Sequence, residues 1–519
     1  MNDSELADES KGEATPNPGT TSASQTLGLS ALDPSFPLSE LLRSGGISTH
    51  HEMASSIHKQ FQSPFSWPLR RKAAVLTSPF FAAMLAAYSA GAYAMAAPPL
   101  QQRWQVTPTE FNIGITIFVA GFGFAPMTLA PVSEAYGRYW VFVGSGVVFF
   151  LGTLGCALTN SYAGMLVSRL VTGSGASVFA TLTGGVVGDV FRKEDRNTPM
   201  ALYSLAILVG TGLGPLISGI TVDRLGWRWI FYLQLVFIGS TTLAILLTFT
   251  ETRSNVLLQR KCAALNSCME RRGYSLRFQS QFAEEGFDLN IIWKSFAFPM
   301  RLLITEPVVF CFSMWASFAW AILYMQFNSI GIVFRDVYGF DSTRVGAVFT
   351  AVIVASILST CLAICQNHVL LRLWPHRMAT PEGRLLSPSL QSILLPIGLF
   401  WFGWTARANV SWVSPALAIA SCTMGIFSIY LAVFNYLADT YGPFGSSAQA
   451  AQSMCRNLLA GIFPLVTHIM LRNLTYAGAG SLLGGLGLVL TAIPWALSFY
   501  GHQIRARSLF AKTVIEMHH

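Results

Sequence analysis

Residues 199–221 read PMALYSLAILVGTGLGPLISGIT, a run of 23 residues without a single Asp, Glu, Lys or Arg. About 20 apolar residues in a helix cross the roughly 30 Å hydrocarbon core of a membrane. The run lacks the alternation of a membrane strand, and a helix satisfies its backbone hydrogen bonds within one segment. The stretch therefore predicts a transmembrane helix.

Eleven further stretches have the same character, so we expect twelve spans. They lie at 76–97, 111–132, 140–158, 163–188, 199–221, 228–249, 307–327, 343–365, 389–404, 411–436, 446–470 and 478–500. Of the 519 residues, 52% are hydrophobic and 11% are charged, about half the charged fraction usual in soluble proteins. This composition excludes an ordinary soluble enzyme, a disordered protein and a nucleic-acid-binding module. It predicts an all-α polytopic membrane protein.

The loops between the spans are short, except for the segment 250–306. This long loop is expected to be cytosolic and to separate two six-helix bundles, at 67–249 and 307–500. Residues 1–66 are rich in Ser, Thr, Pro and acid, which predicts a disordered cytosolic tail, and a short cytosolic tail is expected at 501–519. The segments on the side of the termini hold 24 Lys and Arg and the opposite segments hold 7, an asymmetry that places both termini in the cytosol.

Three short motifs stand out among the spans of the first half. The loop after the second span reads APVSEAYGR at 130–138, the fourth span carries RLVTGSGA at 169–176, and the fifth carries GTGLGPLISG at 210–219. Gly210 and Gly214 share one helix face and allow close helix approach, and the following proline bends the helix. Such a helix suits rocking during alternating access, although glycine packing alone is the simpler interpretation.

These motifs, in this order, resemble the signature motifs of the major facilitator superfamily, and the motif of the fifth span is similar to that of its drug:proton antiporters. Segments such as PEGRL at 381–385 and IRARS at 504–508 resemble the twelve-span fungal drug:proton antiporters, which include polyamine and toxin exporters. The resemblance covers about residues 66–510. It implies gating or coupling roles for Glu134, Gly137, Arg138, Arg169, Gly173, Gly210, Gly214, Pro215 and Gly219.

Within that resemblance, Glu134 and Arg138 are expected to form the charge latch of the inner gate. Ala135 stands where the family has its first basic residue, so one charge of the latch is missing. The family links the arginine that matches Arg169 to proton coupling.

Two arginines are predicted to lie within the bilayer. Arg169 would sit about 9 Å inside its span and Arg456 about 15 Å, near the midplane. A charge at such depth is costly, so by default it indicates function, with a structural buried pair as the alternative. Acidic residues, by contrast, sit at span ends. Because an exporter of cations would keep a carboxylate in its cavity, this pattern favours an anionic or neutral amphiphilic substrate over a polyamine.

Polar and aromatic residues of the first, seventh, tenth and eleventh spans are candidates for a substrate cavity, although lipid-facing belts also use aromatic residues. They are Tyr88, Tyr93, Trp315, Trp320, Tyr324, Gln326, Tyr430, Asn435 and Arg456. The chain has no GxxxxGK[ST] loop, no CxxC pair and no clustered His with Asp or Cys. No catalytic residue, metal site or cofactor is therefore predicted.

The sequence thus predicts a proton-coupled secondary active transporter of the plasma membrane, not an enzyme. It would export a small organic molecule, preferably a secondary metabolite that is an organic acid or an amphiphile such as a glycolipid. A broad multidrug or polyamine efflux pump is the alternative, and a non-transporting membrane sensor or receptor is an alternative of another class. The expected partners are the substrate, protons and the lipid bilayer, with no nucleic acid, and the protein is expected to be monomeric.

Overall fold

The structure is a computed structural model that describes residues 26–29, 63–192, 195–271, 277–280, 289–378, 380, 382–441 and 445–507. It divides into two units, 1–61 with 257–285 and 62–256 with 286–519. In the first unit, strand β1 (Thr26–Leu29) pairs in parallel with β2 (Arg277–Ser280). These four residues belong to the segment predicted as a disordered tail, and the rest of 1–62 lies outside the described residues.

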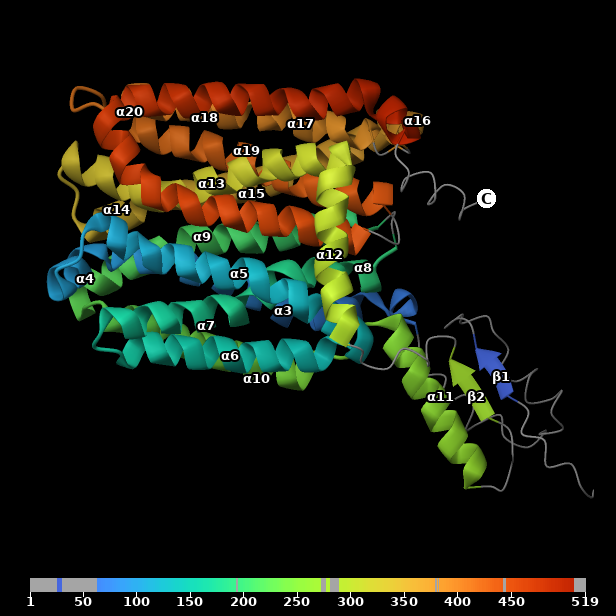
Figure 1. Ribbon diagram of the computed structural model, residues 1–519. Helices are drawn as coiled ribbons and strands as arrows, with labels where there is room; N and C mark the ends of the chain where they lie inside the picture. Colours follow the sequence, from blue (N-terminus) through green and yellow to red (C-terminus); the bar gives the residue numbers. More distant parts are fainter. Residues whose placement is uncertain are drawn as a thin grey trace, which may run out of the picture. The chain divides into compact units, whose positions relative to one another are not determined.

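The second unit is a helical bundle (Figure 1). Its first half consists of the 3-10 helix η1 (Pro64–Ser66), α3 (Leu69–Met95), α4 (Ala97–Trp104), α5 (Pro108–Tyr136), α6 (Arg138–Leu158), α7 (Tyr162–Thr181), α8 (Thr183–Val190), α9 (Asn197–Leu225) and α10 (Arg228–Thr248). Helix α11 (Ser254–Glu270) follows, and it crosses the boundary between the two units.

The second half of the bundle begins with α12 (Leu289–Thr305). Its other elements are α13 (Pro307–Asp336), α14 (Ser342–Val348), α15 (Thr350–Leu373), α16 (Pro375–Met378), η2 (Gly383–Leu385), α17 (Leu386–Ser392), α18 (Leu394–Thr405), α19 (Val413–Tyr441) and α20 (Gly445–Arg507). Within the described residues, 11 helices are long and apolar enough to cross a membrane.

The eleven helices correspond to the twelve predicted spans, because α20 contains two consecutive spans and is counted once. Thr475 has φ 62° and ψ 168°, which is not helical, and it falls between the predicted spans 446–470 and 478–500. The chain therefore turns between its last two spans with hardly any loop. The predicted fold class is confirmed for the bundle.

Small residues let helices of the first half approach each other closely. Helix α9 packs on α3 so tightly that a Cβ added at Gly210 would overlap the backbone carbonyl of Met84. At Gly214 an added Cβ would lie 2.5 Å from the carbonyl oxygen of Tyr88. These glycines are therefore packing positions, as their spacing of four predicts.

The two halves also meet closely, at the end of the bundle where α4 and α14 lie (Figure 1). We call this end the α4 end and the opposite one, with α8 and α16, the α8 end. Near the α4 end, a Cβ at Gly219 would lie 2.5 Å from the carbonyl oxygen of Ser342. The Thr343 amide and hydroxyl both donate to Asp223 Oδ2 at 2.7 Å, and Asn112 Nδ2 donates to the carbonyl oxygen of Pro464 at 2.9 Å. The halves are therefore held together at the α4 end.

The packing of α9 on α3 gives a first testable prediction. Gly210→Val should destabilise the protein by about 1–3 kcal/mol, because the added methyl groups have no space beside Met84. Gly144→Val on α6 is the matched control, since nothing lies within 4 Å of a Cβ added there. Thermal unfolding of both purified variants in detergent measures the difference. Equal midpoints would show that the contact between α3 and α9 tolerates a side chain.

Candidate functional site

Arg456 lies in the core of the bundle, with 1% of its surface exposed. Its guanidinium carbon lies 4.6 Å from the ring centre of Trp320, 5.2 Å from that of Tyr430 and 5.9 Å from that of Phe434. Ring faces attract a cation through their quadrupole, and the attraction strengthens when water is excluded. The three rings, which we call the aromatic cage, therefore hold the charge of Arg456 without a carboxylate.

The in-plane donors of the same guanidinium are mostly unused. Nη2 donates to Ser453 Oγ at 3.2 Å, whereas Nε and Nη1 have no hydrogen-bond partner. No salt bridge to Arg456 occurs among the described residues. An arginine presents its donors as a planar fork that matches carboxylate and phosphate oxygens. The site can therefore accept an anion at the edge of the guanidinium.

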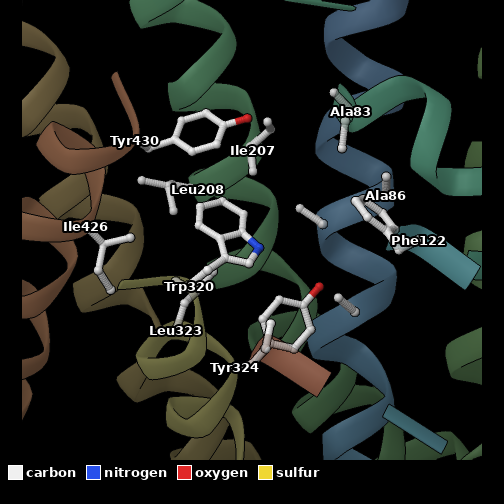
Figure 2. Close-up of a cluster of buried hydrophobic side chains, with 14 of the residues drawn as sticks. Ala83, Ala86, Phe122, Ile207, Leu208, Trp320, Leu323, Tyr324, Ile426 and Tyr430 are labelled. Carbon is white, nitrogen blue, oxygen red and sulfur yellow. The ribbon is translucent and has the colours of Figure 1, made fainter. Parts of the chain in front are cut away.

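The rings of the cage are ordered by contacts with each other. Trp320 stacks on Tyr430 with centroids 5.0 Å apart, and Phe434 follows Tyr430 one helical turn later at 4.6 Å. Figure 2 shows the indole nitrogen of Trp320 and the hydroxyl oxygens of Tyr430 and Tyr324 on the side that faces α3. Trp320 Nε1 has no hydrogen-bond partner. The polar atoms of these three side chains are thus directed towards the first half.

Arg169 is fully buried in the first half, but it is held differently. Nε donates to the carbonyl oxygen of Gly114 at 3.3 Å and Nη1 to that of Ser89 at 3.2 Å. Its guanidinium carbon lies 4.5 Å from the ring centre of Tyr93 and 4.2 Å from that of Phe118. Arg169 therefore ties α7 to α3 and α5 through backbone oxygens and ring faces.

A buried tyrosine of the second half also faces the first half. Tyr324 on α13 is buried, and its hydroxyl oxygen lies on the side that faces α3 (Figure 2). Polar groups from the two halves, which lie far apart in the sequence, are thus brought to the same part of the bundle.

The expected latch has a different acid in this structure. Arg138 Nε lies 3.1 Å from Asp189 Oδ2, and its Nη1 donates to Ser133 Oγ at 2.9 Å. Arg253 also contacts Asp189, at 3.4 Å. Glu134 is half-exposed and is not in a salt bridge among the described residues. The predicted pair of Glu134 with Arg138 is therefore not formed.

The turn at Gly137 explains the change of partner. Its φ of 102° reverses the chain between α5 and α6, so Glu134 and Arg138 belong to different helices. Glu251 fills the space beside Gly137, where its Oε1 accepts from the Arg138 amide at 3.0 Å and its Oε2 from the Tyr139 amide at 3.3 Å. A carboxylate at this point satisfies the first amides of α6 and favours its dipole.

The remaining predicted residues divide into three groups. Tyr88, Trp315 and Gln326 are buried, and Trp315 Nε1 and Gln326 Oε1 have no hydrogen-bond partner. Gly173 and Pro215 serve packing, since a Cβ at Gly173 would overlap the backbone of Phe118 and the Pro215 ring closes on Gly91. Asn435 lies apart from the cage, and its Nδ2 donates to Asn197 Oδ1 of the first half at 3.1 Å.

Sequence reasoning missed three residues of these sites. Phe434 carries a detectable signal, because it lies one helical turn after Tyr430 and so shares its face. Asp189 carries none, because it lies 51 residues from Arg138. Glu251 belongs to the segment ETR at 251–253, which resembles the fungal antiporters, but it lies 113 residues from Arg138 and only the fold brings the two together.

Comparison with known proteins identifies the family. The model of the Major Facilitator Superfamily matches residues 79–464. The transporter paaT of Penicillium rubens is 32% identical over 412 residues, which cover 78% of this chain and 74% of that protein. The citrinin biosynthesis cluster transporter mrr1 of Monascus ruber is 30% identical over 454 residues, 86% of this chain and 90% of that one. The efflux pump FUB11 of Gibberella fujikuroi is 32% identical over 403 residues, 77% and 70% of the two chains.

Solved structures show the same fold. The Escherichia coli xylose transporter XylE, in a partially occluded inward-open conformation, aligns with a TM-score of 0.58 at 13% identity and covers 82% of this chain and 98% of that one. The human organic anion transporter MFSD10 aligns with a TM-score of 0.55 at 18% identity and covers 83% and 100%. The family match and the helical bundle therefore agree that this chain is a multi-pass membrane transporter, not an enzyme, and that it belongs to the major facilitator superfamily.

Proposed function

We propose that the protein is a proton-coupled exporter of a secondary metabolite, an organic acid or acidic amphiphile, across the plasma membrane by alternating access. The observation that carries the proposal is Arg456, a buried guanidinium with two unused donors inside an aromatic cage. The printed names of relatives add support, since they include an efflux pump and a transporter of a biosynthesis cluster.

The electrostatics of the cage favour an anion. A buried ion pays a desolvation cost of several kcal/mol, which an opposite charge with good hydrogen-bond geometry offsets. A carboxylate at the edge of Arg456 would fill Nε and Nη1 and leave the apolar body of the ligand against Trp320 and Tyr430. A polyamine would meet a fixed positive charge there, so the alternative of polyamine export is disfavoured.

The contacts between the halves support alternating access. The two halves are joined at the α4 end by a few hydrogen bonds and by glycine contacts. The bonds to the carboxylate of Asp223 are exposed, so water can replace Thr343 when the halves separate there. The latch of Arg138 and Asp189 lies within the first half and keeps α6 and α8 together. Each half can therefore move as a unit while the site between them changes sides.

The role of Arg456 is tested by Arg456→Gln in the organism that carries the gene. Comparing metabolites in medium and cells of a deletion strain and its complemented parent first identifies the exported compound. The variant should lower its export about tenfold or more, because a hydrogen-bonded charge contributes about 1.5–3 kcal/mol. Arg407→Gln is the control, since Arg407 also lies over a ring, that of Trp404, but on the exposed surface. Unchanged export by the Arg456 variant would refute the proposal.

Proton coupling is tested at Arg169 in proteoliposomes. Arg169→Lys keeps the charge but loses the fork that reaches the backbone oxygens of Gly114 and Ser89. We expect transport driven by a pH gradient to fall, whereas exchange of labelled for unlabelled substrate continues. Arg228→Lys is the matched control, because that guanidinium lies over Trp227 outside the core. An equal loss of both modes would show that Arg169 has only a structural role.

The latch is tested by two conservative variants. Asp189→Asn should destabilise the protein by about 3–5 kcal/mol, because it leaves the buried Arg138 without its acid. Glu134→Gln should leave the unfolding midpoint unchanged, since Glu134 has no salt bridge in the described structure. Thermal unfolding in detergent compares them, and the reverse order would place the latch at Glu134.

A further inference from the structure

A cavity towards the α8 end of the bundle lies on a different face of α19 from the aromatic cage. Its wall combines the start of α9, from the first half, with α15, η2, α17 and α19 of the second half. The hydrogen bond of Asn435 to Asn197 crosses between the halves at this cavity. The cavity is therefore built by both halves, and its shape must change whenever they move.

The polar part of the lining is cationic. Two arginines, Arg196 and Arg384, line it, and no Asp or Glu of the described chain does. Arg196 Nη2 makes one long hydrogen bond, 3.4 Å to the carbonyl oxygen of Gly188, and its buried Nε has no hydrogen-bond partner. Arg384 is anchored by Nε, which donates to the carbonyl oxygen of Met378 at 3.0 Å. One arginine is thus fixed and the other keeps donor capacity.

Amide side chains extend this polar surface. Asn197, Asn367, Gln391 and Asn435 line the cavity beside the two arginines. Amide nitrogens donate to anionic oxygens, and a neutral amide does not compete for the guanidinium as a carboxylate would. The lining also contains aliphatic side chains, which include Leu370, Leu371, Met378, Leu385 and Leu431. A cavity that combines cationic, amide and aliphatic side chains suits a ligand with an anionic head and an apolar body.

We propose that this cavity is a second binding site, separate from Arg456, for an amphiphilic organic anion. Helix α19 connects the two sites, since Tyr430 and Phe434 face Arg456 while Leu431 and Asn435 line the cavity. In the proposed export the α8 end faces the cytosol, and the cavity holds the substrate before it reaches Arg456. Only this role of the cavity rests on the proposed function. The same chemistry would fit the head group of an anionic lipid.

Photolabelling tests the site with a defined probe. The purified full chain in phosphatidylcholine nanodiscs is irradiated with 4-benzoylbenzoate, an apolar carboxylate that inserts into nearby C–H bonds, and labelled peptides are mapped by mass spectrometry. We expect a saturable adduct on the peptide that contains Met378, and at least fivefold less with the uncharged 4-benzoylbenzamide. Equal labelling by the acid and the amide would overturn the proposal.

Variants assign the label to the cavity. Arg196→Gln should reduce the adduct about tenfold, the loss expected for one charged hydrogen bond, and Arg196→Lys should restore part of it. Arg372→Gln is the matched control, since Arg372 is exposed and follows the lining residue Leu371 on α15. Ala363→Phe fills the cavity and should block labelling even if Arg196→Gln fails to fold. Undiminished labelling in Arg196→Gln and Ala363→Phe would overturn the proposal.

Two further labelling experiments test the cavity independently of the proposed export and identify the source of the anion. Labelling should persist in Arg456→Gln, and its loss there would show that the two sites are one. Persistent labelling together with unchanged export by Arg456→Gln would retain the cavity and refute only the proposed export.

Adding phosphatidylserine to the nanodiscs should suppress labelling if a lipid head group is the natural ligand, and should leave it unchanged if a soluble anion is. Both results support an anion site.

Discussion

The bundle is organised around two buried arginines, Arg169 and Arg456, that form no salt bridge within the part of the chain that the structure describes. In a medium without water, a guanidinium must find partners in the protein or in a ligand. Arg169 finds backbone carbonyl oxygens of two neighbouring helices, and so it completes the first half. Arg456 finds ring faces and one hydroxyl, which leaves the edge of its guanidinium for something else. The two side chains are chemically identical, but their surroundings differ. Arg169 therefore connects helices of the first half, whereas Arg456 keeps donors for a ligand.

The same constraint explains the character of the contacts elsewhere. Helices within a half approach through glycines, because apolar packing is the main attraction available between helices in lipid. The salt bridges of the described residues lie instead at the α8 end, where Arg138 and Arg253 contact Asp189. Glu251 also caps α6 there. Close apolar packing thus stabilises the interior of the halves, while directional polar contacts hold their ends.

Much of the fold follows from the sequence because hydrophobic length is a local property. Runs of apolar residues predicted every span, and Arg456 was located by its depth within one of them. The latch was predicted less well, because the sequence near Arg138 shows Glu134 but not the acids that the fold brings from residues 189 and 251. The break at Thr475 falls between the last two predicted spans, but its form could not be predicted, since a single backbone torsion ends the helix without a loop.

The carboxylate of Glu251 has a consequence for the central segment. Its Oε1 accepts hydrogen bonds from the Thr252 and Arg253 amides as well as from the Arg138 amide, so the chain just after α10 is fastened to the start of α6. The structural border between the halves therefore lies after Arg253 rather than at the end of α10. If the gene were divided to produce the two halves as separate polypeptides, the first would need these residues to close its own helix end.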